Sequence, residues 1–285
     1  MGLLVVVGCG ADVPVEKTRA LKTAKSKEST TAPSEPTPEQ LDAAKKAVTK
    51  LGGRYQPRTD RQTNTKMHIF RVPPDKLKQM PDLPFGFILD FGYDVEITDN
   101  DLKEMQRFKN LTGLQLDFSK GVTDAGLEHL ASLKNLTRLH LEETGVKGPG
   151  VEKLIAVLPR LDILGLESRQ MTDEILRRLR KNGKLHGLIH LAGGPGPDYG
   201  SVDSDEKIRV LILRGSQVTD VGLKELRGLN NLTRLDLRFT RVTDTGLNHL
   251  QEFKKLAQLN LTDTGVTDAG VEQFRKAHPD CSIRR

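Results

Sequence analysis

The sequence contains no tryptophan, only three tyrosines and nine phenylalanines, and only two cysteines in 285 residues. So few aromatic rings argue against carbohydrate platforms and base-stacking channels, which need several exposed rings. Cys9 and Cys281 lie at opposite ends of the chain, so they support neither a disulfide framework nor a cysteine-based zinc site. No apolar run approaches the roughly 20 residues of a membrane-spanning helix. The length allows one large domain or two small ones.

The net charge of +6 is unevenly distributed along the chain. Residues 1–65 hold 11 Lys and Arg against 7 Asp and Glu, a balance of +4, which leaves only +2 for the remainder. A nucleic-acid binder would concentrate its excess of positive charge on a folded face, where it neutralises phosphates. We therefore expect no nucleic-acid ligand.

Residues 1–37 read as a leader that is disordered from about residue 10 onward, because Lys, Ser, Thr, Pro and Glu dominate there. Its start, MGLLVVVGCG, contains VVGC, which resembles a bacterial lipoprotein box ending at Cys9, although no Lys or Arg precedes the apolar run. Two interpretations stay open. A lipid on Cys9 would place the protein at the cell envelope or in the periplasm and would be its sole membrane attachment. Alternatively, the start codon is misassigned and the protein is cytoplasmic.

A tandem repeat dominates the rest of the chain. LTRLDLRFTRVTDTGLNHLQEFKK, from Leu232, is followed directly by LAQLNLTDTGVTDAGVEQFRKAHP, from Leu256, and LTGLQLDFSKGVTDAGLEHLASLKN begins at Leu111. Each copy starts with LxxLxL, whose alternating leucines predict a short strand with one buried face. A turn follows, then an LxxL seam at helical spacing, so one unit is strand, turn and helix.

The Thr-Asp pair of each unit predicts the start of its helix. Thr is a favoured cap, and Asp in the first turn offsets the positive end of the helix dipole. The glycine two residues after the Asp would let the helix and strand layers approach closely. These pairs are interpreted as structural, not catalytic.

This pattern resembles the leucine-rich repeat family, in particular its ribonuclease-inhibitor-like and cysteine-containing subtypes, as in planctomycete bacterial proteins. The resemblance covers about 200 of the 285 residues. It implies an α/β fold, a right-handed solenoid or horseshoe with a parallel inner sheet and outer helices. Residues 86–285 would form about seven repeats plus a terminal half-repeat in which Cys281 is buried.

Two regions depart from the repeat. Residues 38–85 predict a cap, with an amphipathic helix over 38–52 and a strand over 66–72, which would cover the apolar end of the array. The loop 193–206, in AGGPGPDYGSVDSDEK, carries glycine-proline junctions where a helix is expected, so it cannot form a regular helix.

No catalytic or cofactor motif is present, so we expect a non-enzymatic protein without a cofactor. His140 and His190 would lie two strands apart, about 10 Å, which is too far to share a metal directly, and we expect no metal site.

The strand residues that alternate with the leucines would face the hollow of a horseshoe. They form acidic rows toward the N-terminal repeats, basic ones toward the C-terminal repeats, and an apolar strip between them. We predict that this face binds a protein or peptide of opposed charge, and that the protein is a monomer. The predicted binding residues are Asp117, Arg138, His140, Glu142, Ile163, Glu167, Leu188, His190, Val210, Ile212, Arg214, Arg234, Asp236 and Arg238.

Two other functions remain open. The repeat subtype also occurs in F-box substrate adaptors of ubiquitin ligases, although residues 38–80 are too few and too polar for a helical F-box. An enzyme could instead have its site in the loop 193–206, with Asp198, Tyr199, Asp203 and Asp205 as its candidate groups.

Overall fold

The computed structural model describes residues 32–59, 64–92, 95–189 and 204–285. Cys9 and its proposed lipidation lie outside these residues, as do His190 and positions 193–203 of the irregular loop. No helix in the described ranges is both long enough and apolar enough to cross a membrane.

The N-terminal region, predicted to be a cap, combines one helix with a two-stranded hairpin. Helix α1 (Pro38–Lys50) occupies the expected position, and Thr37 and Gln40 exchange hydrogen bonds across its first turn. Strands β1 (Arg54–Thr59) and β2 (Lys66–Arg71) pair antiparallel, and the short 3₁₀ helix η1 (Pro74–Gln79) follows. The sequence predicted only β2. Strand β1 was missed because Pro57 weakens its strand pattern, and its position at the edge of the sheet is where proline is tolerated.

The described strands form two sheets, and from β2 onward every neighbouring pair within a sheet is parallel. The first sheet continues with β3 (Phe87–Asp90), β4 (Leu111–Gln115), β5 (Arg138–His140), β6 (Ile163–Gly165) and β7 (Leu188–Ile189). The second contains β8 (Val210–Ile212), β9 (Arg234–Asp236), β10 (Gln258–Asn260) and β11 (Ser282–Arg284). The expected α/β class with parallel strands is confirmed.

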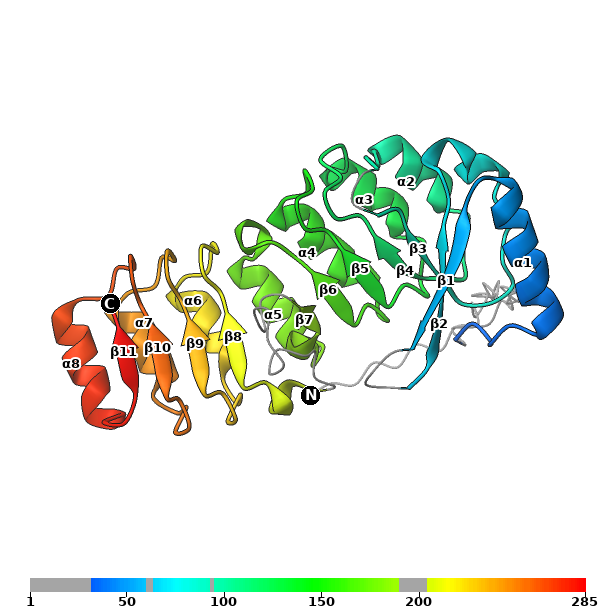
Figure 1. Cartoon of the computed structure of the whole chain (residues 1–285). Helices are drawn as coiled ribbons and strands as arrows, with labels where there is room; N and C mark the ends of the chain where they lie inside the picture. Colours follow the sequence, from blue (N-terminus) through cyan, green and yellow to red (C-terminus); the bar gives the residue numbers. More distant parts are fainter. Residues whose placement is uncertain (1–31, 60–63, 93–94, 190–203) are drawn as a thin grey trace, which may run out of the picture. The chain divides into compact units, whose positions relative to one another are not determined.

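Helical segments connect successive strands and lie along one side of each sheet (Figure 1). Those that accompany the first sheet are α2 (Asp99–Met105), α3 (Asp124–Leu130), α4 (Gly148–Val157), η2 (Ser168–Gln170), α5 (Asp173–Lys181) and η3 (Leu185–Gly187). Those of the second part are η4 (Asp205–Lys207), α6 (Asp220–Leu223), η5 (Lys224–Leu226), α7 (Asp244–Leu247), η6 (Asn248–Leu250) and α8 (Asp268–Ala277).

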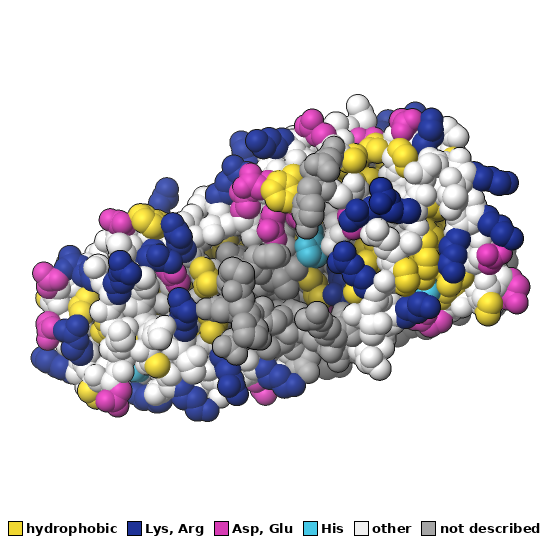
Figure 2. Space-filling view, viewed as in Figure 1, with side chains coloured by type: hydrophobic (Ala, Val, Ile, Leu, Met, Phe, Trp, Pro, Cys, Tyr) yellow, Lys and Arg dark blue, Asp and Glu magenta, His cyan; other side chains and the backbone are white. Residues whose placement is uncertain are grey.

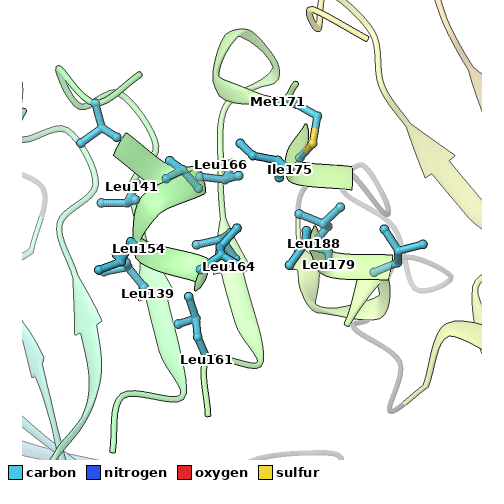
Figure 3. Packing of buried hydrophobic residues seen from close by; sticks show 14 of the residues in the cluster. Leu139, Leu141, Leu154, Leu161, Leu164, Leu166, Met171, Ile175, Leu179 and Leu188 are labelled. Carbon is cyan, nitrogen blue, oxygen red and sulfur yellow. The ribbon is translucent and has the colours of Figure 1, made fainter. Parts of the chain in front are cut away.

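The core lies between the strands and the helices and consists mainly of the repeat leucines. Leu139 and Leu164, from the centres of β5 and β6, pack toward Leu154 and Leu179 of the helices (Figure 3). Burying a leucine side chain contributes about 1.5 to 3 kcal/mol to the free energy of folding, so the leucines of the LxxLxL pattern account for much of the stability of the repeats. Cys281 is also buried, as expected for a small apolar residue, and burial raises the pKa of its thiol.

The Thr-Asp pairs join one unit to the next. Asp220 accepts two hydrogen bonds from Thr243 of the following unit, from the backbone N–H at 2.7 Å and from the hydroxyl at 2.6 Å. The same two bonds recur in the pairs Asp99–Thr123, Asp173–Thr219 and Asp244–Thr267. The carboxylates do lie in the first helical turns. Their hydrogen bonds, however, form a ladder between units that the sequence did not reveal.

The repeated glycines make room for this ladder. A Cβ at Gly246 would lie 2.3 Å from Oδ1 of Asp220, and one at Gly270 would lie 2.0 Å from Oδ1 of Asp244. Real Cβ atoms do not approach a neighbour so closely. The interpretation that these glycines serve an approach between helix and strand layers is therefore wrong, because the close neighbour is the carboxylate of the preceding unit.

The ladder also continues where the strand order breaks. Strands β7 and β8 belong to different sheets in the described part of the chain. On the helix side, however, Thr219 donates from its N–H and its hydroxyl to Asp173, and the N–H of Gln217 donates to the carbonyl of Met171 at 3.0 Å. Hydrogen bonds thus join the units on either side of the irregular loop.

A buried histidine lies at the same junction. Nδ1 of His186 is 2.9 Å from Oδ1 of Asp205, and Nε2 is 3.6 Å from Oδ1 of Asp162. Hydrogen bonds with Asp162 and then with Asp205 raise the pKa of His186 to about 9. The hydrogen bond from His186 lowers the pKa of Asp162. Burial opposes ionisation of Asp205, but the bonds from His186 still hold its pKa below the usual value. The cluster therefore favours an imidazolium between two carboxylates.

This cluster should make stability fall with rising pH. The pKa of His186 is about 6.5 when unfolded and about 9 when folded, so its contribution is complete below pH 6.5 and lost as pH passes 9. We expect His186→Gln to remove about 1 to 3 kcal/mol at pH 6 and much less at pH 10. Urea unfolding at both pH values measures the difference, with His249→Gln as the control. An equal loss at both pH values would contradict the assignment.

Candidate functional site

The strand face consists of the side chains that flank the central leucine of each strand, on the side of the sheet away from the helices. In the first sheet, Gly113, Arg138 and Ile163 pair in one row, and Gln115, His140 and Gly165 pair in the next. In the second sheet the corresponding rows are Val210, Arg234 and Gln258, and Ile212, Asp236 and Asn260. This register is the one predicted for β4–β6 and for β8–β10.

Leu188 is a correction to the predicted face. It pairs with Leu164 of the core row, its side chain is fully buried, and it lies beside Leu179 of α5 (Figure 3). The predicted register for β7 is one residue out, so Leu188 belongs to the core. His190 lies outside the described residues, and the predicted stack of His140 with His190 is not part of the described site.

The expected apolar strip is also smaller than predicted. Ile163 lies in the strand-face row but is only 8% exposed, whereas Val210 and Ile212 are partly exposed. With Leu188 in the core, no continuous strip joins these three residues in the described part of the face.

Acidic side chains gather beyond the ends of β4, β5 and β6. Asp117, Glu142 and Glu167 occupy equivalent positions in successive units, and Oδ1 of Asp117 accepts the N–H of Glu142 at 3.0 Å. Glu167 accepts the N–H of Glu143 and pairs with Arg169. Partial burial, together with the charges of Asp117, Glu167 and Glu143, raises the pKa of Glu142 to about 7. The predicted acidic row is thus present, and the repulsion within it is centred on Glu142.

His140 lies against this acidic group. Its Nδ1 is 3.7 Å from Oδ2 of Asp117, and both side chains are less than 20% exposed. Figure 2 shows acidic side chains gathered beside a histidine over the middle strands of the first sheet. The sequence placed His140 and the carboxylates on the same predicted binding face but did not predict that their polar atoms converge.

One basic residue of the second sheet, Arg238, is engaged by a neighbouring carboxylate, which the sequence did not predict. Arg238 binds Asp236 through both carboxylate oxygens, with Nε at 2.9 and 3.0 Å, and Asp236 is almost fully buried. Burial works against ionisation of Asp236, but the bonds from Arg238 keep its pKa below the ordinary value. Arg214 lies 5.5 Å from the ring centre of Phe239, which is half exposed. The basic patch therefore comprises Arg214 and Arg234, with Arg238 largely neutralised by its neighbour.

A further polar group was missed by the sequence argument. Arg71 of β2 donates to Oδ2 of Asp90 from Nε at 3.1 Å and from a terminal nitrogen at 2.8 Å. With Arg58, Gly92, Gln115 and Asp117 these residues line a pocket of about 100 Å³. Asp90 and Gln115 lie in the same strand-face row as His140, but Arg71 comes from β2, which precedes the repeats and for which the repeat gave no register.

One family model matches the chain. It is the leucine-rich repeat model, over residues 228–250, which span the end of one unit, strand β9 and the helical turns after it. The matched segment is a leucine-rich repeat. The subtype is not decided by this match, and no curated protein matches the chain.

Several solved structures are similar to this protein. An internalin from Listeria monocytogenes is 17% identical, with a TM-score of 0.44 over 70% of this chain and 54% of that one. A Leptospira interrogans leucine-rich repeat protein is 19% identical, with a TM-score of 0.41 over 75% and 63%. Internalin C2 of L. monocytogenes is 21% identical, with a TM-score of 0.38 over 87% and 82%. The present chain spans less than two thirds of the length of the first two.

Proposed function

We propose that this protein is a non-catalytic interaction module, built of leucine-rich repeats, that binds a protein or peptide on its strand face. The observation that carries the proposal is the repeated register. It presents Arg138 and His140 on the first sheet, and Arg234 on the second, from strands held by a leucine core. Charged and polar groups on rigid elements suit recognition of a complementary partner, because little side-chain and backbone freedom is lost on binding.

The charges divide the proposed docking surface into two regions. Asp117, Glu142 and Glu167 make the first sheet acidic beyond the strand ends, while Arg214 and Arg234 are exposed on the second. A ligand with basic and acidic stretches in opposite order would match both, and charge pairing would set its orientation. The exposed ring of Phe239 beside Arg214 offers an apolar contact of the kind that contributes most to affinity.

The other candidate functions have less support. The described residues between positions 38 and 79 form α1, the β1–β2 hairpin and η1, which does not match a helical F-box. Of the groups considered for an enzyme site, Asp198, Tyr199 and Asp203 lie outside the described residues, and Asp205 is engaged by His186 and Arg180. Attachment to the envelope through a lipid on Cys9 remains a proposal, with a cytoplasmic protein as the alternative.

A charge-reversal experiment tests the docking proposal. The full chain carrying Arg138→Glu and Arg214→Glu alters the strand face of both sheets. A matched control carrying Lys153→Glu and Lys224→Glu makes the same charge change on the helix side, where both lysines are exposed. Proteins retained from cells of the source organism are quantified by mass spectrometry. We expect the strand-face variant to retain about tenfold less of at least one protein, which corresponds to a loss of about 1.4 kcal/mol in binding free energy. The control variant should retain that protein as the wild type does. The same retained set for both variants would contradict the proposal.

A further inference from the structure

Three potential metal ligands converge on the strand face of the first sheet. One nitrogen of His140 and one oxygen each of Asp117 and Glu142 all lie within 4.8 Å of one another. His140 ends β5, Glu142 lies two residues beyond it, and Asp117 comes from the neighbouring unit, beyond β4. The parallel pairing of Gln115 with His140 fixes this arrangement, because it aligns the residues that follow the two strands.

The backbone holds one of these ligands in position. Oδ1 of Asp117 accepts the N–H of Glu142, which leaves Oδ2 directed toward Nδ1 of His140 at 3.7 Å. In metal sites, a carboxylate ligand is commonly held in position by a hydrogen bond to a surrounding group while it binds the metal. The hydrogen bond from the Glu142 N–H would hold Asp117 in this way. In the described residues, this is the sole group of three such side chains whose ligand atoms lie so close together.

The next strand leaves space for an ion beside these atoms. Gly165 of β6 pairs with His140, and a Cβ at this position would lie 3.1 Å from Oε1 of Glu142 and 3.2 Å from Nδ1 of His140. Both donor atoms therefore lie beside a strand-face position that has no side chain. A larger residue at position 165 would occupy the space that two of the three ligands face.

We propose that Asp117, His140 and Glu142 bind one divalent transition-metal ion, of the kind represented by Zn²⁺. One imidazole nitrogen with two carboxylate oxygens suits such an ion, whereas Ca²⁺ takes six to eight oxygen ligands. Metal–ligand distances near 2.0–2.2 Å require the three ligand atoms to lie closer together than they do here. Side-chain rotations that move each atom by about 1 Å would bring them into range. Three protein ligands leave a fourth position for water or for a donor from outside the chain.

The prediction that no metal is bound rested on the distance between two histidines. It did not consider one histidine with two carboxylates, because the strand pattern alone does not show which polar atoms of neighbouring units lie close together. The metal proposal is independent of the docking proposal, and the variants that test docking leave all three ligands and Gly165 unchanged.

Calorimetric titration of the full, metal-free chain with ZnCl₂ tests the site. We expect one saturable equivalent in the wild type and at least tenfold weaker binding in His140→Ala and in Glu142→Gln. The control His249→Ala removes a histidine from η6 and should bind as the wild type does. Glu142→Gln also relieves the repulsion among the carboxylates, so it is expected to fold, as circular dichroism would show.

A fourth variant separates the site from a general effect of charge. Gly165→Val keeps every ligand but fills the space beside them, and it should also weaken Zn²⁺ binding at least tenfold. The proposal is overturned if the wild type shows no saturable Zn²⁺ binding, or if His140→Ala binds Zn²⁺ like the wild type. Tighter binding of Ca²⁺ than of Zn²⁺ would overturn the assignment to a transition metal.

Discussion

Leu188→Ala is expected to lower the free energy of unfolding by about 2 to 5 kcal/mol, because it removes three carbon atoms from a fully buried side chain. Leu188 pairs with Leu164 and belongs to the same core as Leu179 (Figure 3). The surrounding strands and helices are held by their own hydrogen bonds, so they cannot close completely around the cavity. Urea unfolding followed by circular dichroism measures the loss.

Val210→Ala is the matched control for Leu188→Ala. Val210 begins β8 on the strand face and is partly exposed, so its truncation should cost less than about 1 kcal/mol. The register originally predicted for β7 would place Leu188 and Val210 in the same row, and the two substitutions would then have similar small effects. Equal losses would therefore contradict the observed register.

Gly270→Ala is expected to cost about 2 to 3 kcal/mol, although alanine is the better helix former. The new Cβ would lie 2.0 Å from Oδ1 and 2.4 Å from Cγ of Asp244, which is held by two hydrogen bonds to Thr267. Either the helix moves or these bonds break. The loss measured by urea unfolding thus reports on the joint between two units.

A double-mutant cycle isolates that joint. The three nearest atoms to the added Cβ all belong to the Asp244 carboxylate, so Asp244→Ala removes each of them. In the Asp244→Ala background, Gly270→Ala should cost close to nothing or stabilise slightly through its helix propensity. The expected coupling is more than about 1 kcal/mol. Additive losses would mean that the glycine is needed for some reason other than room for the carboxylate.

The sequence predicted the repeating unit because its information is local and recurs. LxxLxL gives the strand and its buried face, and the Thr cap gives the helix start, as the side chains of Thr172 and Thr267 show by accepting backbone N–H groups. The predicted register of β7 is wrong because GLIHL resembles a strand start, whereas the structure pairs Leu188 with Leu164. Each of these leucines follows another leucine, Leu185 or Leu161, by three residues. The three-residue spacing of these leucines was the available signal.

The strand face could be predicted as rows but not as a set of contacts. Alternation decides that Arg138 and His140 share a face, yet it cannot show that Arg238 turns back to bind Asp236. Nor can it show that polar atoms of Asp117, His140 and Glu142 converge, or that those of His140 and Glu142 lie beside Gly165. These arrangements depend on side-chain rotamers, and on the missing Cβ of a residue one strand away.

Site-directed photocrosslinking tests the role of the strand face most directly. A photoreactive phenylalanine analogue replaces Arg138 on β5 in one variant and Lys153 on α4 in another, and the cells of the source organism are irradiated. If the strand face binds a partner, position 138 should give a discrete protein adduct that position 153 does not. Adducts from position 153 with none from position 138 would place the contact on the helices and contradict the account.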